Sequence, residues 1–420
     1  MNTDTYYFPN IVDVKSAVDT LSGVASVTPL MMSINYSKQY DCNVLLKRED
    51  LQIVRSYKIR GAYNKMKSLT VDQLANGIVC ASAGNHAQGV AYSCKALKVY
   101  GKIFMPSPTP GQKIDQVKMF GEEYVEVILV GDTFDEASEH ARQYCTAHGM
   151  SFIHPFDDEK VIEGQATIGL EIIDQSDVPI DYVFLPVGGG GLAAGLSSVF
   201  KVLSPNTKII GVEPHGAPSM KHSIDQKQNQ TLKCIDKFVD GAAVKRVGER
   251  NFSICANNLY DVITVDEGKI CETILHVYNK AAIVLEPAGA LSLSALDQYA
   301  EKIKGKNVVC IISGGNNDIT RMEEIKERAM LYQGLKHYFL VKFPQRAGAL
   351  KEFVAEILGP FDDITHFEYT KKTSREKGTA VVGVELKHKQ DFDPLIARMK
   401  DKQFFGGYLN DNEVLMDMLV

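Results

Sequence analysis

Tryptophan is absent from this 420-residue chain, and the patterns of several protein classes are absent with it. There is no long run of Lys and Arg, and the net charge is −6, which argues against nucleic acid or an anionic membrane as a partner. No uninterrupted apolar run approaches the roughly 20 residues of a membrane-spanning helix. The polar start, MNTDTYYFPN, does not resemble a signal peptide. We therefore expect a cytoplasmic protein.

Clustered cysteines are also lacking. The eight cysteines are scattered, with no CxxC pair and no spacing typical of a metal site. In a chain of this length, isolated cysteines are typical of reduced thiols that pack in a core. With 45% apolar residues, the chain can form a large core and two or three domains. We expect no bound metal.

Between about residues 75 and 320, short β-branched runs alternate with longer segments that have apolar residues at helical spacing. Near-continuous apolar strands between helices are typical of a parallel sheet buried on both faces. Open α/β folds of this kind bind ligands at the carboxyl ends of their strands. The expected strands are 77–82, 101–105, 124–130, 181–187, 208–213 and 307–313, and the expected helices include 133–148 and 163–175.

The pattern changes near residue 330. The order strand, helix, strand, strand, helix is typical of a ferredoxin-like α+β domain. We therefore divide the chain into residues 1–328 and 329–420. The tail elements are expected at 337–343, 347–358, 364–370, 379–386 and 392–400, with a short closing strand after them.

Four segments carry residues suited to chemistry. The first, Arg55-Ser-Tyr-Lys58-Ile-Arg-Gly-Ala62, places a lysine among small residues at an expected helix start. Small residues let a cofactor approach closely. A lysine amine that is desolvated or beside other cations has a lowered pKa and can act as a nucleophile. Most lysines are solvated surface charges, so this segment is not decisive by itself.

The second segment, Cys80-Ala-Ser-Ala-Gly-Asn85-His-Ala-Gln-Gly89, lies between an expected strand and an expected helix. The amides of the turn at Ser82 and Gly84, and the Asn85 side chain, can hold a carboxylate or a phenolic oxygen. An ordinary capped turn explains the same residues. His86 is a candidate acid or base, although we favour a packing or hydrogen-bonding role.

The third segment, Leu185-Pro-Val-Gly188-Gly-Gly-Gly-Leu-Ala-Ala-Gly195, places four glycines between a strand and an apolar helix. Successive glycine amides at a helix start can converge on a phosphate. The Lys-Ser/Thr ending of a P-loop is missing, which argues against ATP. A dinucleotide site with Glu213 as its acidic residue and a simple packing turn remain alternatives. In the fourth segment, Cys310-Ile-Ile-Ser313-Gly-Gly-Asn316, Ser313 could face a heterocycle nitrogen.

The four segments together, in this order and spacing, resemble the fold-type II pyridoxal-phosphate enzymes, the tryptophan synthase β family. Within it, the chain is similar over almost its whole length to the biosynthetic threonine dehydratases. The segment Phe343-Pro-Gln-Arg-Ala-Gly-Ala-Leu350 resembles their ACT-like regulatory domain, of which one copy fits here. The resemblance implies two open α/β subdomains, a C-terminal ACT-like α+β domain, pyridoxal 5′-phosphate as cofactor and a homotetramer.

The resemblance also implies roles for single residues. Lys58 would be the Schiff-base lysine and general base, Asn85 would bind the pyridine 3-oxygen, and Ser313 would face the pyridine nitrogen. The phosphate would be bound by Gly188, Gly189, Gly190, Gly191 and Leu192, and the substrate carboxylate by Ser82, Ala83, Gly84, Asn85 and His86.

The implied reaction is α,β-elimination of L-threonine to 2-oxobutanoate and ammonia, the first step of isoleucine biosynthesis, with L-serine as a second candidate substrate. A serine at the ring nitrogen makes a weak electron sink, which favours loss of a β-leaving group over transamination. A serine racemase has a second acid–base residue where this chain has Ala83. The alternatives are racemisation, β-replacement and a non-catalytic amino-acid sensor. The ACT-like tail argues against the first two, and the intact Lys58 against the third.

Two further expectations concern ligands other than the substrate. By resemblance, isoleucine would act as allosteric effector through the tail, where a turn at 344–348 is a candidate carboxylate site. A purely structural or oligomer-forming tail is the alternative. The segment Glu213-Pro-His-Gly-Ala217-Pro-Ser219 is similar to the racemase metal site, but Ser219 stands where a carboxylate is expected, so a divalent cation is not expected there.

Overall fold

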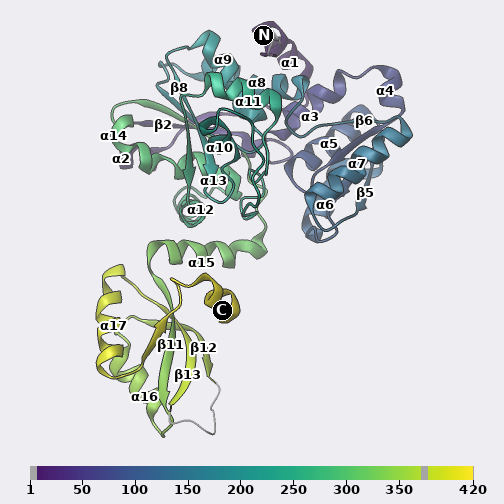
Figure 1. Ribbon diagram of the computed structural model, residues 1–420. Helices are drawn as coiled ribbons and strands as arrows, with labels where there is room; N and C mark the ends of the chain where they lie inside the picture. Colours follow the sequence, from purple (N-terminus) through teal and green to yellow (C-terminus); the bar gives the residue numbers. More distant parts are fainter. Residues whose placement is uncertain (1–6, 370–376, 420) are drawn as a thin grey trace. The chain divides into compact units, whose positions relative to one another are not determined.

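The computed structural model describes residues 7–369 and 377–419. The chain forms two compact units, Met1–Arg321 and Met322–Val420 (Figure 1). The first residues of the polar N-terminal stretch and Thr370, at the end of an expected strand, lie outside the described residues. Within the described part, no helix is long and apolar enough to cross a membrane.

The first unit contains a large sheet of six strands in the order β1-β2-β10-β7-β8-β9. All neighbours are parallel except the pair β1 and β2. The expected strands 181–187, 208–213 and 307–313 are confirmed. The other three were not expected, because they lack long buried apolar runs. The bounds are β1 (Leu30–Met32), β2 (Asn43–Arg48), β7 (Tyr182–Pro186), β8 (Lys208–Pro214), β9 (Asp261–Val265) and β10 (Asn307–Ile312).

A second sheet of the first unit has four parallel strands in the order β5-β4-β3-β6. Alternate residues of its central strands face opposite sides, so Cys80 packs toward α5 and Val79 toward α7. Both faces are therefore buried, as the apolar runs predicted. The bounds are β3 (Ile78–Ala81), β4 (Gly101–Met105), β5 (Val125–Leu129) and β6 (Ser151–Phe152).

The helices of the first unit cover these two sheets. In chain order they are α1 (Ile11–Leu21), α2 (Ile34–Tyr40), α3 (Lys58–Lys67), α4 (Val71–Ala75), α5 (Asn85–Leu97), α6 (Gly111–Gly121), α7 (Phe134–His148), α8 (Glu159–Gln175), α9 (Gly191–Leu203), α10 (Ser219–Asp225), α11 (Glu249–Asn258), α12 (Glu267–Ala281), α13 (Pro287–Ser294) and α14 (Ala300–Ile303).

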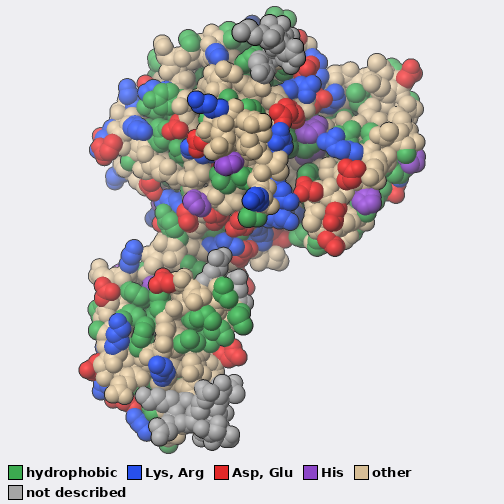
Figure 2. Space-filling model, in the orientation of Figure 1, with side chains coloured by type: hydrophobic (Ala, Val, Ile, Leu, Met, Phe, Trp, Pro, Cys, Tyr) green, Lys and Arg blue, Asp and Glu red, His purple; other side chains and the backbone are tan. Residues whose placement is uncertain are grey.

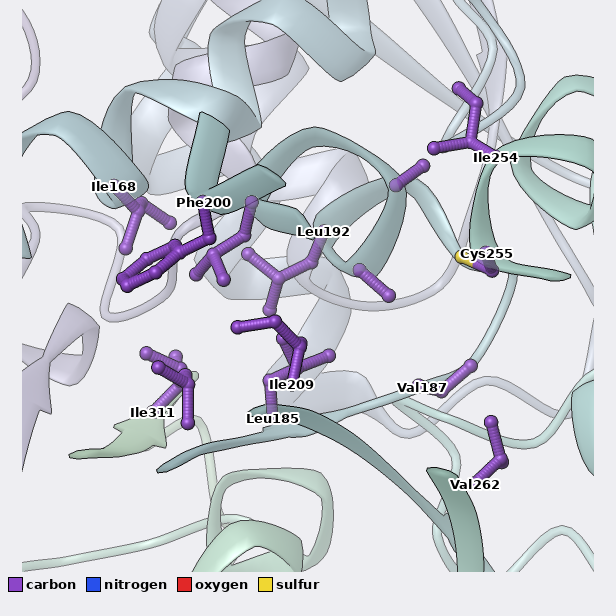
Figure 3. Close-up of a cluster of buried hydrophobic side chains, with 14 of the residues drawn as sticks. Ile168, Leu185, Val187, Leu192, Phe200, Ile209, Ile254, Cys255, Val262 and Ile311 are labelled. Carbon is purple, nitrogen blue, oxygen red and sulfur yellow. The ribbon is translucent and has the colours of Figure 1, made fainter. Parts of the chain in front are cut away.

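The core of the large sheet fixes the position of α9. Figure 3 shows Leu185 and Ile209, from β7 and β8, beside Leu192 and Phe200 of α9, and all four side chains are buried. Because Leu185 precedes the glycine run and Leu192 follows it, the core holds both ends of that run. Seven of the eight cysteines are also buried, as free thiols, and Cys234 is exposed.

The second unit has one antiparallel sheet in the order β12-β13-β11-β14, which confirms the expected ferredoxin-like element order and its closing strand. On the face of this unit that Figure 2 shows, apolar and charged side chains are mixed. The expected helix 347–358 is one α-helical turn followed by a π-helical turn, and it starts after Gly348, whose φ is 84°. The bounds are α15 (Met322–Gln333), β11 (Lys336–Pro344), α16 (Ala349–Glu352), η5 (Phe353–Ile357), β12 (Asp363–Tyr369), β13 (Lys377–Glu385), α17 (Phe392–Asp401), β14 (Phe405–Tyr408) and α18 (Glu413–Leu419).

A buried ion network fixes the start of α3. The Arg60 guanidinium donates to both oxygens of Glu49 at 2.8 Å and to both oxygens of Glu171 at 2.5 and 2.9 Å. Lys47 of β2 lies 2.6 Å from the same Glu171. Although burial opposes it, Arg60 holds the pKa of Glu49 below its ordinary value. The network joins β2, α3 and α8. Its central residue, Arg60, follows Lys58 by two positions in α3.

Removing the charge of Glu49 should therefore destabilise the protein strongly. Glu49→Gln leaves a buried guanidinium short of a carboxylate, and we expect the free energy of unfolding to fall by about 3–5 kcal/mol in urea titrations. Glu301→Gln is the matched control, because Glu301 pairs with Lys304 in solvent and should cause no measurable change. Equal effects of the two substitutions would contradict this role of the network.

Candidate cofactor and active site

The four sequence segments meet at the carboxyl ends of β7 and β10. Two adjoining hollows lie there and share the Lys58 side chain. The first is lined by Tyr57, Lys58, Phe156, Pro186, residues 188–191, Leu192 and Gly241. The second is lined by Tyr57, Lys58, Asn85, Pro186, Gly188, Gly241, Ala242, Glu286, Ala288 and Ser313. The structure thus brings Lys58, Asn85, the glycine run and Ser313 together.

Lys58 is the first residue of α3, and its backbone is held close to the end of β10. The Tyr57 N–H donates to the Ser313 carbonyl at 3.2 Å, and the Lys58 Nζ donates to the Pro155 carbonyl at 3.1 Å. Desolvation lowers the pKa of the Lys58 amine to about 8, although Glu286 acts in the opposite direction. An amine in this state is partly uncharged near neutral pH and can act as a nucleophile or a base.

The glycine run forms a cradle with no room for side chains. A Cβ atom on Gly189 would lie 2.2 Å from the Phe156 ring, and one on Gly188 would lie 2.9 Å from the Ala242 Cα. Gly190 has a φ of 89°, a conformation that favours glycine. The run ends at the N-terminus of α9, where backbone N–H groups and the helix dipole favour an anion.

Asn85 is the first residue of α5, and its side-chain amide has a fixed orientation. Its Oδ1 accepts from the Asn316 Nδ2 at 2.7 Å, and its Nδ2 donates to the Glu286 Oε1 at 2.7 Å. The second hydrogen of the same nitrogen can still donate to a ligand oxygen. Ser313 is buried at the end of β10, and its hydroxyl donates to the Ala288 carbonyl at 3.3 Å.

Glu286 was missed in the sequence and is the nearest carboxylate to this arrangement among the lining residues. Burial raises its pKa to about 7, and Asp240 adds to this, whereas Asn85, Lys113 and Lys58 act against it. Glu286 lies between Leu285 and Pro287 in an apolar stretch. A lone carboxylate in such a stretch was a usable signal, because unpaired acidic residues are rarely buried.

The residues expected to bind the substrate carboxylate form the turn between β3 and α5. Ser82, Ala83 and Gly84 precede Asn85 there, and the Ser82 hydroxyl accepts from the Gly84 N–H at 3.2 Å. His86 is buried, and its Nε2 lies 2.9 Å from the Ile153 carbonyl. Burial, and then Lys58, lower the pKa of His86 to about 3, so its ring is neutral at physiological pH.

The loop after β6 closes one side of the site and was also missed. His154 Nδ1 accepts from the N–H groups of Phe156 and Asp157 at 3.2 and 2.8 Å. Burial lowers the pKa of His154 to about 4, which keeps this nitrogen an acceptor. The Asp157 carboxylate in turn caps the start of α11 at Glu249. The loop therefore places Phe156 over the glycine run, and no periodic sequence pattern marks it.

Glu213 lies apart from these residues, at the end of β8. Its two oxygens accept from the N–H groups of Met220 and Lys221 at 2.7 and 2.8 Å, and its side chain is buried. A carboxylate engaged in this way argues against the dinucleotide alternative, which needed Glu213 for a ribose. The Ser219 hydroxyl donates to the Val244 carbonyl. The described residues include no group of three or more His, Cys, Asp or Glu side chains that could hold a metal ion.

These residues fit pyridoxal phosphate. The cofactor has a phosphate, which matches the cradle that any Cβ would obstruct. It has an aldehyde, which matches the Lys58 amine. Its phenolic oxygen matches the Asn85 donor, and its ring nitrogen matches the Ser313 hydroxyl.

Gly189→Ala tests the cradle, because its added methyl group collides with Phe156. We expect the affinity for pyridoxal phosphate, measured by equilibrium dialysis, to fall by about tenfold or more, the equivalent of about 1.4 kcal/mol. The control is Gly111→Ala at the start of α6, where a Cβ meets nothing within 4 Å. An unchanged affinity in Gly189→Ala would show that the cradle does not hold the phosphate.

Comparisons with known proteins agree in pointing to one family. A family model described as "pyridoxal-phosphate dependent enzyme" matches residues 21–314, and one described as "C-terminal regulatory domain of threonine dehydratase" matches residues 327–419. The biosynthetic L-threonine dehydratase IlvA of Halalkalibacterium halodurans is 56% identical over 410 residues, which cover 98% of this chain and 99% of that protein. The Bacillus subtilis protein of the same name is 53% identical over 414 residues, 98% of each chain.

Solved structures are similar to this chain over about three quarters of its length. The processed form of threonine deaminase isoform 2 from Solanum lycopersicum has a TM-score of 0.72 and 43% identity, covering 76% of this chain and 92% of its own. A serine racemase from Dictyostelium discoideum has a TM-score of 0.68 and 32% identity, covering 73% of this chain and 98% of its own.

Proposed function

The chain belongs to the pyridoxal-phosphate-dependent enzymes of the threonine dehydratase family, and from this membership we propose that it converts L-threonine to 2-oxobutanoate and ammonia. One observation carries the proposal: the partly buried Lys58 amine lies in the same hollow as the glycine run. The reaction would be the first step of isoleucine biosynthesis. L-serine, which has the same β-hydroxyl group, would be a second substrate.

The residues of the proposed site have the following roles. Lys58 holds the cofactor and is the general base, Asn85 donates to the cofactor's 3-oxygen, and Ser313 faces its ring nitrogen. The amides of residues 188–192 bind the phosphate. The turn formed by Ser82, Ala83, Gly84, Asn85 and His86 binds the substrate carboxylate. The positions and contacts of these residues support the assignment.

When bound, pyridoxal phosphate supplies an electron-withdrawing ring that takes up the electron pair left when Cα loses its proton. The chain supplies the base, because desolvation keeps part of the Lys58 amine uncharged near neutral pH. Tyr57 and Phe156 line the same hollow, and the centre of the Tyr57 ring lies 5.3 Å from the Lys58 Nζ. Ser313 supplies a hydroxyl group, not a carboxylate, so the chain places no negative charge at the ring nitrogen.

Glu286 adjusts the charge around this base. Its carboxyl group accepts the Asn85 hydrogen bond and holds a proton up to a pKa of about 7. Below that pH, Asn85 and Lys58 face a neutral group. Above it they face a carboxylate, which favours the protonated form of Lys58. Glu286 is therefore a positioning residue that acts through Asn85 and Lys58.

We divide the chain into a catalytic part, residues 1–328, and a regulatory part, residues 329–420, with L-isoleucine as the effector of the latter. The description of the matching C-terminal family supports regulation. The turn at residues 344–348, between β11 and α16, is the candidate site for the effector's carboxylate. We further propose, from the family alone, a homotetramer in the cytoplasm that has neither nucleic acid nor membrane as a partner.

Lys58→Ala tests the activity and the lysine together. We expect the visible absorbance of the lysine-bound cofactor to disappear and 2-oxobutanoate release from threonine to fall by about a thousandfold or more, because both the attachment point and the base are lost. Lys67→Ala, which changes an exposed lysine of the same helix, is the control.

Two results would contradict the proposal. Wild-type protein with the visible absorbance but without 2-oxobutanoate would indicate β-replacement or racemisation at the same lysine. Wild-type protein without absorbance, even after pyridoxal phosphate is added, would rule out the cofactor assignment.

Glu286→Gln should make the Lys58 amine less basic. The groups facing Glu286 are Tyr57, Lys58, Asn85, Asp240 and Lys113. The Glu286 carboxylate raises the pKa of Lys58. In cofactor-free wild-type enzyme, the rate of pyridoxal phosphate attachment should rise with pH through about 8, as the amine loses its proton. In Glu286→Gln the rise should occur at lower pH. Stopped-flow absorbance measures the profile, and a rise at the same or higher pH would contradict the role of Glu286.

A further inference from the structure

Asp240 joins two distant parts of the first unit. One of its carboxylate oxygens pairs with Lys113 of α6, beside the four-stranded sheet, and the other lies 3.9 Å from the Arg321 guanidinium. Arg321 also donates to the Phe238 carbonyl at 2.8 Å, and its guanidinium carbon lies 4.9 Å from the centre of the Phe238 ring. Arg321 therefore holds the segment 238–240 by a charge, a hydrogen bond and a stacked ring.

The segment that Arg321 holds continues directly into the wall of the active site. Gly241 and Ala242 follow Asp240 in the chain, and both line the hollow that contains Lys58 and Glu286. The residues around Gly241 are closely packed, because a Cβ on Gly241 would lie 2.8 Å from the Ala288 Cβ and 3.5 Å from a Glu286 oxygen. A Cβ on Gly188 would lie 2.9 Å from the Ala242 Cα. Movement of this segment must therefore change the glycine run or the surroundings of Glu286.

The charges of Asp240 and Lys113 both act on the Glu286 carboxyl group. Asp240 raises the pKa of Glu286 and Lys113 lowers it. A movement of Asp240 or Lys113 relative to Glu286 therefore changes the pKa of the Glu286 carboxyl group, which faces Lys58.

Arg321 also has a special position in the chain. It is the last residue of the short helix η4 (Ile319–Arg321) and of the first unit. The next residue, Met322, is the first residue of α15 and of the second unit. The two helices follow each other without an intervening residue, so Arg321 and the first residue of α15 are joined by a single peptide bond.

We propose that Arg321 couples the regulatory part of the chain to the active site by holding or releasing the segment 238–242. Two discrete arrangements follow. In one, Arg321 and Lys113 share Asp240, and in the other Asp240 pairs with Lys113 alone. Effector binding that moves α15 favours the arrangement in which Arg321 holds Asp240, and this arrangement has the lower turnover, so an enzyme that cannot hold the segment stays active. This inference rests on the proposed function and adds the route of its regulation.

The test uses the full-length, cofactor-loaded enzyme. 2-Oxobutanoate release from threonine is measured at increasing L-isoleucine, and L-isoleucine binding is measured by calorimetry. Arg321→Ala should keep its activity without isoleucine within a few fold and should still bind isoleucine. Its inhibition should be weakened by about 5- to 150-fold, the usual range of coupling between sites. Arg321→Lys keeps the charge but loses the planar fork, so its inhibition should be intermediate.

Arg250→Ala is the matched control, because Arg250 is a half-exposed arginine of the first unit that pairs with Glu159 at 3.5 Å. It should be inhibited like the wild type. Hydrogen exchange of residues 236–242 in the wild type gives a second readout should Arg321→Ala fold poorly. Isoleucine should change the exchange there, and an unchanged rate would overturn the coupling.

The outcomes separate this inference from the proposed function. Equal inhibition of wild type and Arg321→Ala would overturn the coupling and leave both the dehydratase activity and the effector standing. A wild type that releases 2-oxobutanoate but neither binds nor responds to isoleucine would overturn the effector and the coupling, and leave the dehydratase activity. A wild type that releases no 2-oxobutanoate would overturn all three.

Discussion

Desolvation of one amine is the constraint on which the rest of the site depends. A lysine in water is protonated at neutral pH and is neither a nucleophile nor a base. For Lys58, loss of contact with water lowers the pKa of the amine to about 8. The Pro155 carbonyl and the Tyr57 ring lie beside its Nζ and fix its position. The low pKa costs stability, and the surrounding structure holds the amine in place against that cost. The ion pairs of Arg60, and the hydrogen bond from the Tyr57 N–H to the Ser313 carbonyl, fix the start of α3, where Lys58 lies.

Lys58 supplies a side-chain amine, whereas the glycine run supplies backbone N–H donors and has no side chains. Residues with side chains would not fit at these positions, because Phe156 and Ala242 occupy the space that the side chains would need. Anion site and amine thus share one hollow. The adjoining hollow also contains the amine, and Glu286 is the one carboxyl group among its lining residues. With a pKa near neutrality, that group can change charge in the range where the enzyme works. This makes Glu286, and the ion pair at Asp240 that acts on it, a natural point of control.

The sequence allowed much of this to be predicted, because the informative signals are local. The lysine at a helix start and the glycine run between a strand and a helix each occupy a few consecutive residues, and so do the buried strands β3, β4, β7, β8 and β10. The features that the sequence did not predict depend on contacts between residues that are far apart in the chain. Glu286 meets Asn85 across 201 residues, and Arg321 meets Phe238 across 83. The edge strand β1 is short and partly exposed, so it left no periodic signal, and its antiparallel pairing with β2 could not be foreseen.

The most direct test of the account is to locate the cofactor on the chain. Full-length enzyme loaded with pyridoxal phosphate is reduced with borohydride, digested, and its peptides are mapped by mass spectrometry. The account predicts that the reduced cofactor is found on Lys58, and that threonine added before reduction protects this site. Attachment to a different lysine, with Lys58 unmodified, would contradict the central claim that the desolvated amine beside the glycine run is the one that holds the cofactor.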